Sequence, residues 1–197
     1  MDGRVGPLAA PRLVAPAGEY RASFLEALAE PGAESGHLVA LAAGRLAAPA
    51  EFARYVAALR AGADQPGSQD RYLTALIGSP PPRPPEGGYV PQTTLWWVAG
   101  REYLGRISIR HRLTAALLWE GGNIGYEVRP GARRRGHATA MLAAALPLAA
   151  ALGVDPARLD CDAANTASRR VIEKNGGVLD EERGGSLYFW VPTGRPG

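Results

Sequence analysis

The sequence contains little cysteine and no long apolar run, and both absences exclude whole classes of protein. Its single cysteine, Cys161, excludes an internal disulfide, favours a reducing compartment and is expected to be a buried small hydrophobe. No window approaches the ~20 apolar residues of a membrane span. The first residues, Met1-Asp2-Gly3-Arg4, lack the basic-then-apolar pattern of a signal peptide. The sequence therefore predicts a cytoplasmic protein with no membrane partner.

Charge of one sign is also scarce, because 22 Lys and Arg residues against 19 Asp and Glu residues leave a formal charge of +3. This modest excess suits an anionic ligand, whereas nucleic-acid-binding proteins usually carry a basic stripe. Two nucleotide-binding motifs are missing as well. Without GxxxxGK(S/T) the chain is not expected to be a P-loop NTPase, and without GxGxxG after a strand it is not expected to bind a dinucleotide.

The first half of the chain predicts helices and loops. At 197 residues the chain can bury one core, so we expect a single domain. Residues up to about Leu13 mix Gly, Pro and Arg and predict a loose terminus. Apolar periodicity predicts helices at 20–30 and 49–59. The proline-rich segment 79–91 favours an exposed surface loop over a Pro-rich signalling ligand, since its prolines lack backbone donors and prefer an extended path.

The second half predicts strands that alternate with helices. Two β-rich runs are separated by Gly100-Arg101-Glu102, which is a hairpin signal. The predicted strands are 94–99, 104–110, 123–128, 158–162, 178–179 and 187–191, and the predicted helices are 136–152 and 165–175. This order implies an α/β sheet. Ligands of such sheets commonly bind near the carboxyl ends of the strands.

The segment IGYEVRPGARRRGHATAML predicts a binding site for an anion. A strand ends at Val128, a turn and three arginines follow, and Gly136 opens a helix. The first turn of a helix has N–H groups without intrahelical partners and a positive dipole end. Gly136 lets a phosphate approach the backbone, because a Cβ there would crowd it. His137 is expected to face solvent from the first helical turn.

Two motifs resemble those of the GNAT superfamily of acyl-CoA-dependent acetyltransferases. The first is R-x-x-G-x-A at Arg133 to Ala138, which is similar to the pyrophosphate motif of that superfamily. The second, from Asp160 to Gly177, is similar to the pattern Asn-x-x-(Ser/Ala) followed by Glu-Lys-x-Gly-Phe, with Gly177 in place of the Phe. Their order and separation also fit, and the resemblance covers about 93–191. It extends to the branch that acetylates ribosomal-protein N-termini, but that does not assign a substrate.

The resemblance implies a fold and an activity. The fold would be the α/β acyl-CoA N-acyltransferase (GNAT) fold, with a mixed, mostly antiparallel central sheet flanked by helices. Residues 1–92 would form an N-terminal helical part and Pro-rich loop of the same domain, and 93–197 would form the acyl-CoA-binding core. The activity would be transfer of an acetyl group from acetyl-CoA to a primary amine, by direct attack in a ternary complex and with no metal.

The resemblance also assigns residues to acetyl-CoA. The backbone from Tyr126 to Val128 would lie beside the pantetheine arm, where neighbouring strands splay. The N–H groups from Arg134 to Thr139 would hold the pyrophosphate. Asn165 would reach the pantetheine arm, cap the following helix, or do both. The full expected set is Tyr126, Val128, Arg133, Arg134, Arg135, Gly136, His137, Ala138, Thr139, Asn165 and Ser168.

The acid and the base of the reaction are less clearly marked. Many GNAT enzymes use a tyrosine of the last helix as the acid, but Ile172 occupies that position here. The remaining candidates for proton transfer are Glu127, Glu120, Tyr126 and Tyr188, and we assign the base to Glu127 or Glu120. Glu127 would act through a water, or would instead pair with an arginine. Tyr188 is most simply a core residue of the closing strand.

Two other classes of function stay open at this point. The missing tyrosine permits a GNAT-fold module that binds acyl-CoA without catalysis. A nucleic-acid-binding protein would use 133–135 and 169–170, but no exposed aromatics interleave with those arginines. The acceptor amine would belong to a small molecule or a peptide. The sequence leaves open which one, the length of the acyl group, and whether the chain forms a homodimer.

Overall fold

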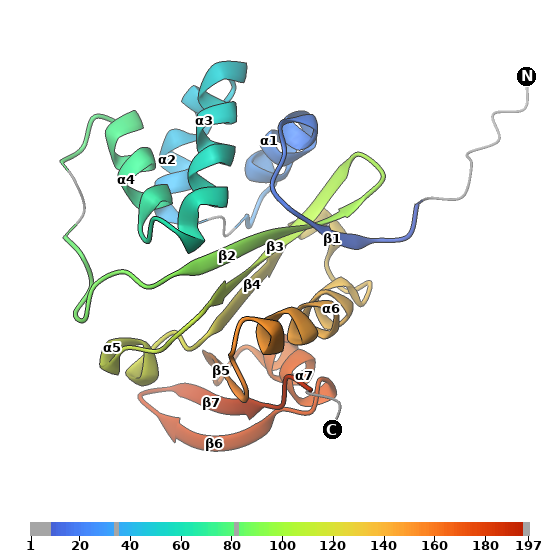
Figure 1. The fold of residues 1–197 in the computed structure, drawn as a ribbon. Coiled ribbons are helices and arrows are strands. Elements are labelled where there is room, and N and C mark those ends of the chain that lie inside the picture. Colours follow the sequence, from blue (N-terminus) through green and yellow to red (C-terminus); the bar gives the residue numbers. More distant parts are fainter. Residues whose placement is uncertain (1–8, 34–35, 81–82, 195–197) are drawn as a thin grey trace, which may run out of the picture.

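Two antiparallel sheets, one between layers of helices and the other at one end of the molecule, appear in a computed structural model that describes residues 9–33, 36–80 and 83–194 (Figure 1). The first sheet has the order β1 (Arg12–Val14), β2 (Gln92–Ala99), β3 (Glu102–Arg110) and β4 (Ile124–Val128). The second has the order β5 (Ala157–Asp162), β7 (Ser186–Val191) and β6 (Val178–Arg183). The chain therefore has the α/β architecture that the sequence predicts.

Helices cover both faces of the first sheet (Figure 1). One face carries α1 (Arg21–Ala29), α2 (His37–Leu46), α3 (Pro49–Arg60) and α4 (Ser68–Leu76). The other face carries α6 (His137–Ala151), which packs on β1, β3 and β4 and is followed by α7 (Thr166–Lys174). The short elements α5 (Ala115–Trp119) and η3 (Pro130–Ala132) lie in the connections on either side of β4. No helix in the described ranges is both long enough and apolar enough to cross a membrane.

Each face has its own hydrophobic core. Under α1–α4 the core is aromatic, and the ring of Phe24 contacts the rings of Phe52, Tyr55, Trp96 and Tyr103. Under α6 the core is aliphatic. Side chains of a strand alternate between faces, so β3 sends its isoleucines into the α6 core and its polar residues toward α2–α4. Beside the aromatic core, the fold thus leaves a polar surface of the sheet that faces α2–α4.

The predicted elements of the second half are confirmed with small shifts of their ends, except that the strand predicted at 178–179 continues to Arg183 as β6. The predicted hairpin is confirmed, but Ala99 pairs with Glu102, so its turn consists of Gly100 and Arg101 and is shorter than the predicted Gly100-Arg101-Glu102. In the first half α1 and α3 are confirmed. The described part of segment 79–91 contains no helix or strand, as predicted.

Two expectations for the first half fall short. The loose terminus up to Leu13 is wrong in part, because Arg12–Val14 pair with the edge of β2 as β1. That pairing partner lies more than eighty residues away in the sequence, so no local pattern marks it. The helices α2, α4 and α5 were not predicted. Both α2 and α4 begin at a glycine N-cap with no side-chain cap, and α5 has five residues.

Candidate active site

The two sheets meet at one end of a gap between β4 and β5. The backbone N–H of Asn123 donates to the Arg158 carbonyl (2.7 Å), and the Arg158 N–H donates to the side-chain oxygen of Asn123 (2.9 Å). Beyond this junction, no backbone hydrogen bond joins β4 to β5 in the described part of the chain. Both strands begin at the junction, so the gap opens toward their carboxyl ends.

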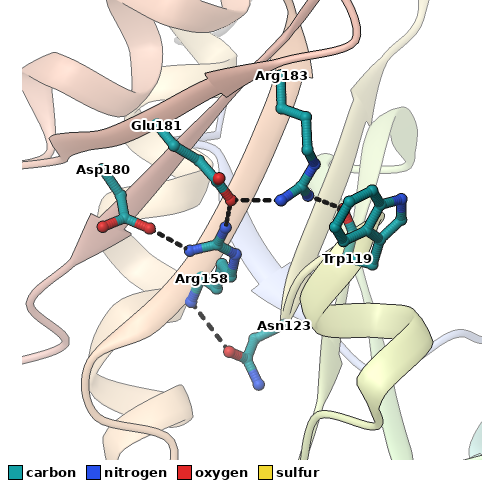
Figure 2. A network of polar contacts seen from close by, with 6 residues as sticks. All are labelled: Trp119, Asn123, Arg158, Asp180, Glu181 and Arg183. Atoms are coloured by element: carbon teal, nitrogen blue, oxygen red, sulfur yellow. Dashed lines mark hydrogen bonds and ion pairs between the residues drawn. The ribbon is translucent and has the colours of Figure 1, made fainter.

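A network of charged side chains holds the junction (Figure 2). The buried Arg158 donates to Asp180 (2.7 Å) and to Glu181 (2.6 Å), and Glu181 also accepts from Arg183 (2.7 Å). Arg183 in turn donates to the carbonyl of Trp119, and its guanidinium carbon lies 3.7 Å from the centroid of that indole ring. The network ties β5 and β6 to the segment that leads into β4.

Backbone groups on the open edge of β4 point into the gap. β3 and β4 are antiparallel, and the N–H of Arg129 donates to the Leu104 carbonyl. In such a pair every second residue bonds to the neighbouring strand. Glu127 therefore bonds to β3, whereas Tyr126 and Val128 turn their N–H and C=O groups toward the gap, where the Val128 carbonyl accepts from Nε of Arg133. The family resemblance implies that this same edge, from Tyr126 to Val128, lies beside the pantetheine arm.

The loop between β4 and α6 has left-handed backbone at two positions. Arg134 has a φ of 62°, and Gly136, the N-cap of α6, has a φ of 80°. A Cβ on Gly136 would meet nothing within 4 Å, so the glycine is needed for its backbone angle and faces open space. The N–H groups of His137, Ala138 and Thr139 belong to the first helical turn and have no intrahelical acceptor. This arrangement offers several donors and a positive helix end to an anion.

The three arginines of the loop differ in what they contact. Arg133 donates from Nε to the Val128 carbonyl (3.0 Å) and from Nη2 to the Gly32 carbonyl (3.1 Å). Its guanidinium is therefore used in holding the loop in place. Arg134 and Arg135 are exposed beside the helix end, where they add positive charge.

His137 faces solvent only in part, so that prediction is wrong in part. Its ring is half-buried, and Nδ1 lies 3.3 Å from the indole Nε1 of Trp97, which donates to it. The contact fixes the first turn of α6 against β2, and the tryptophan that makes it lies forty residues away in the sequence.

The start of α7 reaches β4 through side chains. The side-chain oxygen of Asn165 accepts from the N–H of Ser168 (3.0 Å), which confirms its role as an N-cap. The hydroxyls of Tyr126 and Ser168 hydrogen-bond at 2.8 Å. Burial raises the pKa of Tyr126 to about 12, so the phenol keeps its proton at neutral pH. Cys161 is buried as predicted, and burial raises the pKa of its thiol.

A cavity of about 700 Å³ lies between the α2–α4 helices and the polar face of the sheet. Its walls come from α2, α3, α4, the segment before β2, and the strands β2, β3 and β4. The polar and charged side chains in the lining are His37, Ser68, Gln69, Asp70, Tyr89, Gln92, Thr94, Arg106, Ser108, Arg110 and Glu127. On β4 the lining consists of Gly125, Tyr126 and Glu127, so the cavity reaches the open edge of that strand.

The carboxylates singled out from the sequence are separated by the fold. Glu127 lines the cavity, and its Oε2 lies 3.2 Å from Nε of Arg106, so the predicted arginine pair exists. Glu120 is exposed at the end of α5 and does not line the cavity. Tyr188 is buried in β7, as predicted for a core residue. Ile172 is fully buried, so the side chain at the tyrosine position offers no proton.

Sequence reasoning missed Asp70, which also lines the cavity. It lies in the first turn of α4, a helix that was not predicted. Burial raises the pKa of its carboxyl group, against the lowering effect of Arg106, Arg110 and Arg71. An acidic residue followed by Tyr72-Leu73 was a usable signal for the first turn of a helix. In the described ranges, no group of three or more His, Cys, Asp or Glu residues is placed to hold a metal ion.

Comparison with known proteins identifies relatives of this arrangement. The family model described as an acetyltransferase (GNAT) domain matches residues 32–178. Three similar solved structures cover nearly the whole chain. Mycobacterium smegmatis RimJ in complex with CoA-disulfide has 18% identity and a TM-score of 0.57, over 95% of this chain and 86% of that one. The aminoglycoside acetyltransferase AAC(6′)-Ib in complex with coenzyme A has 14% identity and a TM-score of 0.57, over 93% and 95%. The microcin C7 self-immunity acetyltransferase MccE in complex with acetyl-CoA and AMP has 12% identity and a TM-score of 0.53, over 97% and 99%.

Other comparisons are narrower. The GNAT domain of S. lividans PAT is matched over 51% of this chain and 60% of its own length, with 18% identity and a TM-score of 0.44. A search of curated protein sequences gives no significant match.

Proposed function

Because the chain belongs to the GNAT acetyltransferase domain family, we propose that it moves the acetyl group of acetyl-CoA to a primary amine held in the cavity. One observation carries this proposal. The cavity reaches the open edge of β4 at 125–127, and the same edge borders the gap that leads to the loop 129–136, the proposed anion-binding loop. An acyl donor in the gap and an acceptor in the cavity would therefore meet at β4.

The donor side is formed by the loop and by both edges of the gap. The N–H groups from Arg134 to Thr139 would bind the pyrophosphate, with Arg134 and Arg135 adding charge. Arg133 would fix the conformation of the loop and would not bind the phosphate itself, since its guanidinium donates to two carbonyls. The backbone of Tyr126 and Val128 would bind the pantetheine arm from β4, and Asn165 and Ser168 would approach it from α7. The open space in front of Gly136 fits a bulky phosphate.

Acetyl-CoA supplies an activated thioester, and the residues of the chain supply position and proton transfer. The amine nitrogen forms a bond to the acetyl carbon while the carbon–sulfur bond breaks, with no covalent enzyme intermediate. A lysine-like ammonium has a pKa of about 10.4, so it must first lose a proton. We assign that proton to Glu127 through a water, with Glu120 as the second candidate.

The leaving thiolate departs as the anion or takes its proton from a group outside α7. Ile172 at the usual tyrosine position is buried and apolar. Tyr126 is the phenol nearest to the proposed donor site, and its raised pKa keeps it protonated.

The acceptor class follows less directly from the comparisons. One structural neighbour is the aminoglycoside acetyltransferase AAC(6′)-Ib, and another is Mycobacterium smegmatis RimJ. Both have less than 20% identity to this chain, so they support an amine acceptor in general. We propose an amine-bearing small molecule or a peptide.

The decisive experiment measures release of the CoA thiol from acetyl-CoA in the presence of a panel of amines. We expect thiol release that depends on the amine, with one acetylated amine formed for each thiol. The panel should include peptide N-termini, lysine, aminoglycosides and polyamines. If acetyl-CoA binds tightly but no amine is acetylated, the chain is an acyl-CoA-binding module, which is the alternative that the buried Ile172 permits.

A further inference from the structure

The C-terminal end of α1 contacts the proposed anion-binding loop. Glu30 is the C-cap of α1, and its Oε2 accepts from the backbone N–H of Gly131 (2.7 Å). Its other carboxylate oxygen, Oε1, accepts from Nε of Arg129 (2.7 Å) and also contacts Nη2 of that arginine. Two residues further along, the carbonyl of Gly32 accepts from Nη2 of Arg133 (3.1 Å). One carboxylate from the first half of the chain therefore binds two residues of a loop in the second half.

The contact between Glu30 and the loop is close and charged. The side chains of Arg129 and Glu30 are only 11% and 21% exposed, so water competes little for their hydrogen bonds. A Cβ on Gly131 would lie 3.1 Å from Oε1 of Glu30, so the glycine lets the carboxylate approach the backbone. Burial raises the pKa of Glu30, but the hydrogen bonds from Arg129 and Gly131 outweigh burial and lower the pKa. The carboxylate is therefore ionised at neutral pH, and its bonds to the loop are charge-assisted.

The helix that carries Glu30 is itself fixed to the first sheet. The hydroxyl of Ser23 accepts from the N–H of Tyr103 in β3 (3.0 Å) and from Nη1 of Arg129 (3.2 Å). The next residue, Phe24, is buried in the aromatic core, where its ring contacts that of Tyr103. Because α1 is held by the sheet, Glu30 is a firm attachment point for the loop.

The loop has a conformation that contacts from outside must hold. Arg134 has a φ of 62°, which costs free energy for a residue with a side chain. Such backbone persists only where the surrounding structure over-determines it. The N–H of Ala132 donates to the Arg129 carbonyl (3.0 Å), a bond that closes within the loop. The bonds to Glu30, in contrast, attach the loop to a different element.

We propose that Glu30 is a positioning residue for the acyl donor, because it holds the loop in the conformation whose N–H groups bind the pyrophosphate. This rests on the proposed function, since it takes the loop as the pyrophosphate site. Positioning and direct charge have opposite signs here. A carboxylate beside an anion site repels phosphate, so by charge alone the loss of Glu30 would tighten binding. Positioning predicts weaker binding, because the loop is in its binding conformation for a smaller fraction of the time.

Calorimetric titration of Glu30→Ala with coenzyme A measures this effect without turnover. We expect the Kd to rise about 10-fold, as for a loop that adopts its binding conformation one-tenth as often. Dephospho-coenzyme A keeps the pyrophosphate but lacks the 3′-phosphate, and its Kd should rise by the same factor. Unchanged or tighter binding of coenzyme A overturns the proposal, and so does a loss that is confined to coenzyme A.

Glu26 provides the matched control, because it lies on the same helix and is exposed. Glu26→Ala removes the same charge from α1 and should leave the Kd of coenzyme A unchanged. An equal rise of the Kd in the two variants would assign the effect to the charge of α1 instead of the contact with the loop, and would overturn the proposal.

Thermal melting and kinetics separate positioning from a role in stability alone. The Kd is measured well below the Tm of each variant, where the chain is folded, so a loss of stability alone leaves it unchanged. The KM for acetyl-CoA should rise by the same factor as the Kd, with kcat little changed at saturation. If Glu30→Ala does not fold, Glu30→Gln carries the test, because the amide keeps one acceptor but loses the charge. Its Kd for coenzyme A should rise several-fold, and an unchanged or lower Kd overturns the role of Glu30.

The failure of this inference differs from the failure of the proposed function. Acetyl transfer by the native chain, with unaltered coenzyme A affinity in Glu30→Ala, removes this inference alone. Weaker binding by Glu30→Ala, with no amine acetylated by the native chain, supports the inference and removes the proposed transfer reaction. A native chain that binds no coenzyme A overturns both.

Discussion

At the scale of single residues, backbone angle and side-chain chemistry set different parts of the site. Gly136 has a left-handed φ of 80° at the start of α6 and open space where its Cβ would be. Its contribution is to keep that space clear and to orient N–H groups. Glu127 contributes a carboxylate at the cavity floor, where Arg106 holds it in place. These two positions allow the donor and the acceptor sides to be tested separately.

Gly136→Glu should abolish acetyl-CoA binding, because it puts a side chain and a negative charge where phosphate is expected. Calorimetric titration with acetyl-CoA measures the effect. Gly153→Glu is the matched control, since Gly153 has a φ of 81° and equally open space at the other end of α6. Both variants share the strain of a left-handed residue, about 1 kcal/mol or more. Tight binding by Gly136→Glu would show that the loop is not the phosphate site.

Glu127→Gln should lower kcat about 100-fold with little change in acetyl-CoA affinity, because the amide keeps its shape but loses the basic oxygen. The pH–rate profile should also lose its acidic limb. If the Arg106 pair is the only role of this residue, the variant will instead melt earlier and keep nearly normal turnover. Glu120→Gln in the same assay then tests the second candidate.

At the scale of elements, the gap between β4 and β5 depends on a junction at one end. Asn123 and Arg158 join the two strands where they begin, and the Arg158 side chain is fixed by Asp180 and Glu181 of β6. The side chain of Arg158 is 4% exposed, whereas those of the two acids are about 40% exposed, at 42% and 37%. If the arginine is removed, water can hydrate the two exposed carboxylates. The buried guanidinium, in contrast, depends on the two carboxylates to compensate its charge.

Arg158→Met should reduce the free energy of unfolding by about 2–3 kcal/mol, at the low end for a broken buried pair because its partners reach water. Chemical denaturation measures this change. Arg169→Met is the control, since Arg169 pairs with Glu173 on the exposed face of α7, where water and salt screen the pair and it contributes little to stability. Equal losses in the two variants would mean that burial at the junction has no special importance.

At the scale of the whole molecule, the proposed donor site lies within the second half of the chain, whereas the cavity lies between the helices of the first half and the strands β2, β3 and β4. The anion-binding loop and the gap come from 124–168, whereas the cavity is roofed by helices from 37–76. The strand β1 also inserts the N-terminal segment into the sheet of the second half. A ligand that binds across the gap therefore stabilises the fold as a unit.

Acetyl-CoA at a hundred times its Kd should stabilise the folded chain by about 2.7 kcal/mol, because it binds only the folded state. For a protein of this size that corresponds to a rise in Tm of about 5–10 °C. A melting curve with millimolar acetyl-CoA measures it, and Gly136→Glu should show no rise. An unchanged Tm for the native chain would remove acetyl-CoA as the cosubstrate.

The sequence by itself determined the features that are encoded within a few neighbouring residues. The hairpin at Gly100-Arg101, the cap at Asn165 and the glycine that opens α6 are local, because backbone angles and short hydrogen bonds fix them. The expected order of strands and helices in the second half follows from the same local rules. Apolar periodicity likewise gave α1 and α3.

The tertiary structure alone decided which charges share the cavity and which are paired. Arg106 meets Glu127 because β3 and β4 pair in one register, and Asp70 comes from a helix that no local cap marked. It also explains the glycine that replaces Phe in the second motif, since a Cβ on Gly177 would lie 2.4 Å from the Ile172 side chain. The contacts of the cavity join segments far apart in the sequence, from α2–α4 to β2–β4, and burial there affects the strength of each charge. Local sequence patterns carry no information about which charges pair or about how far burial changes their strength.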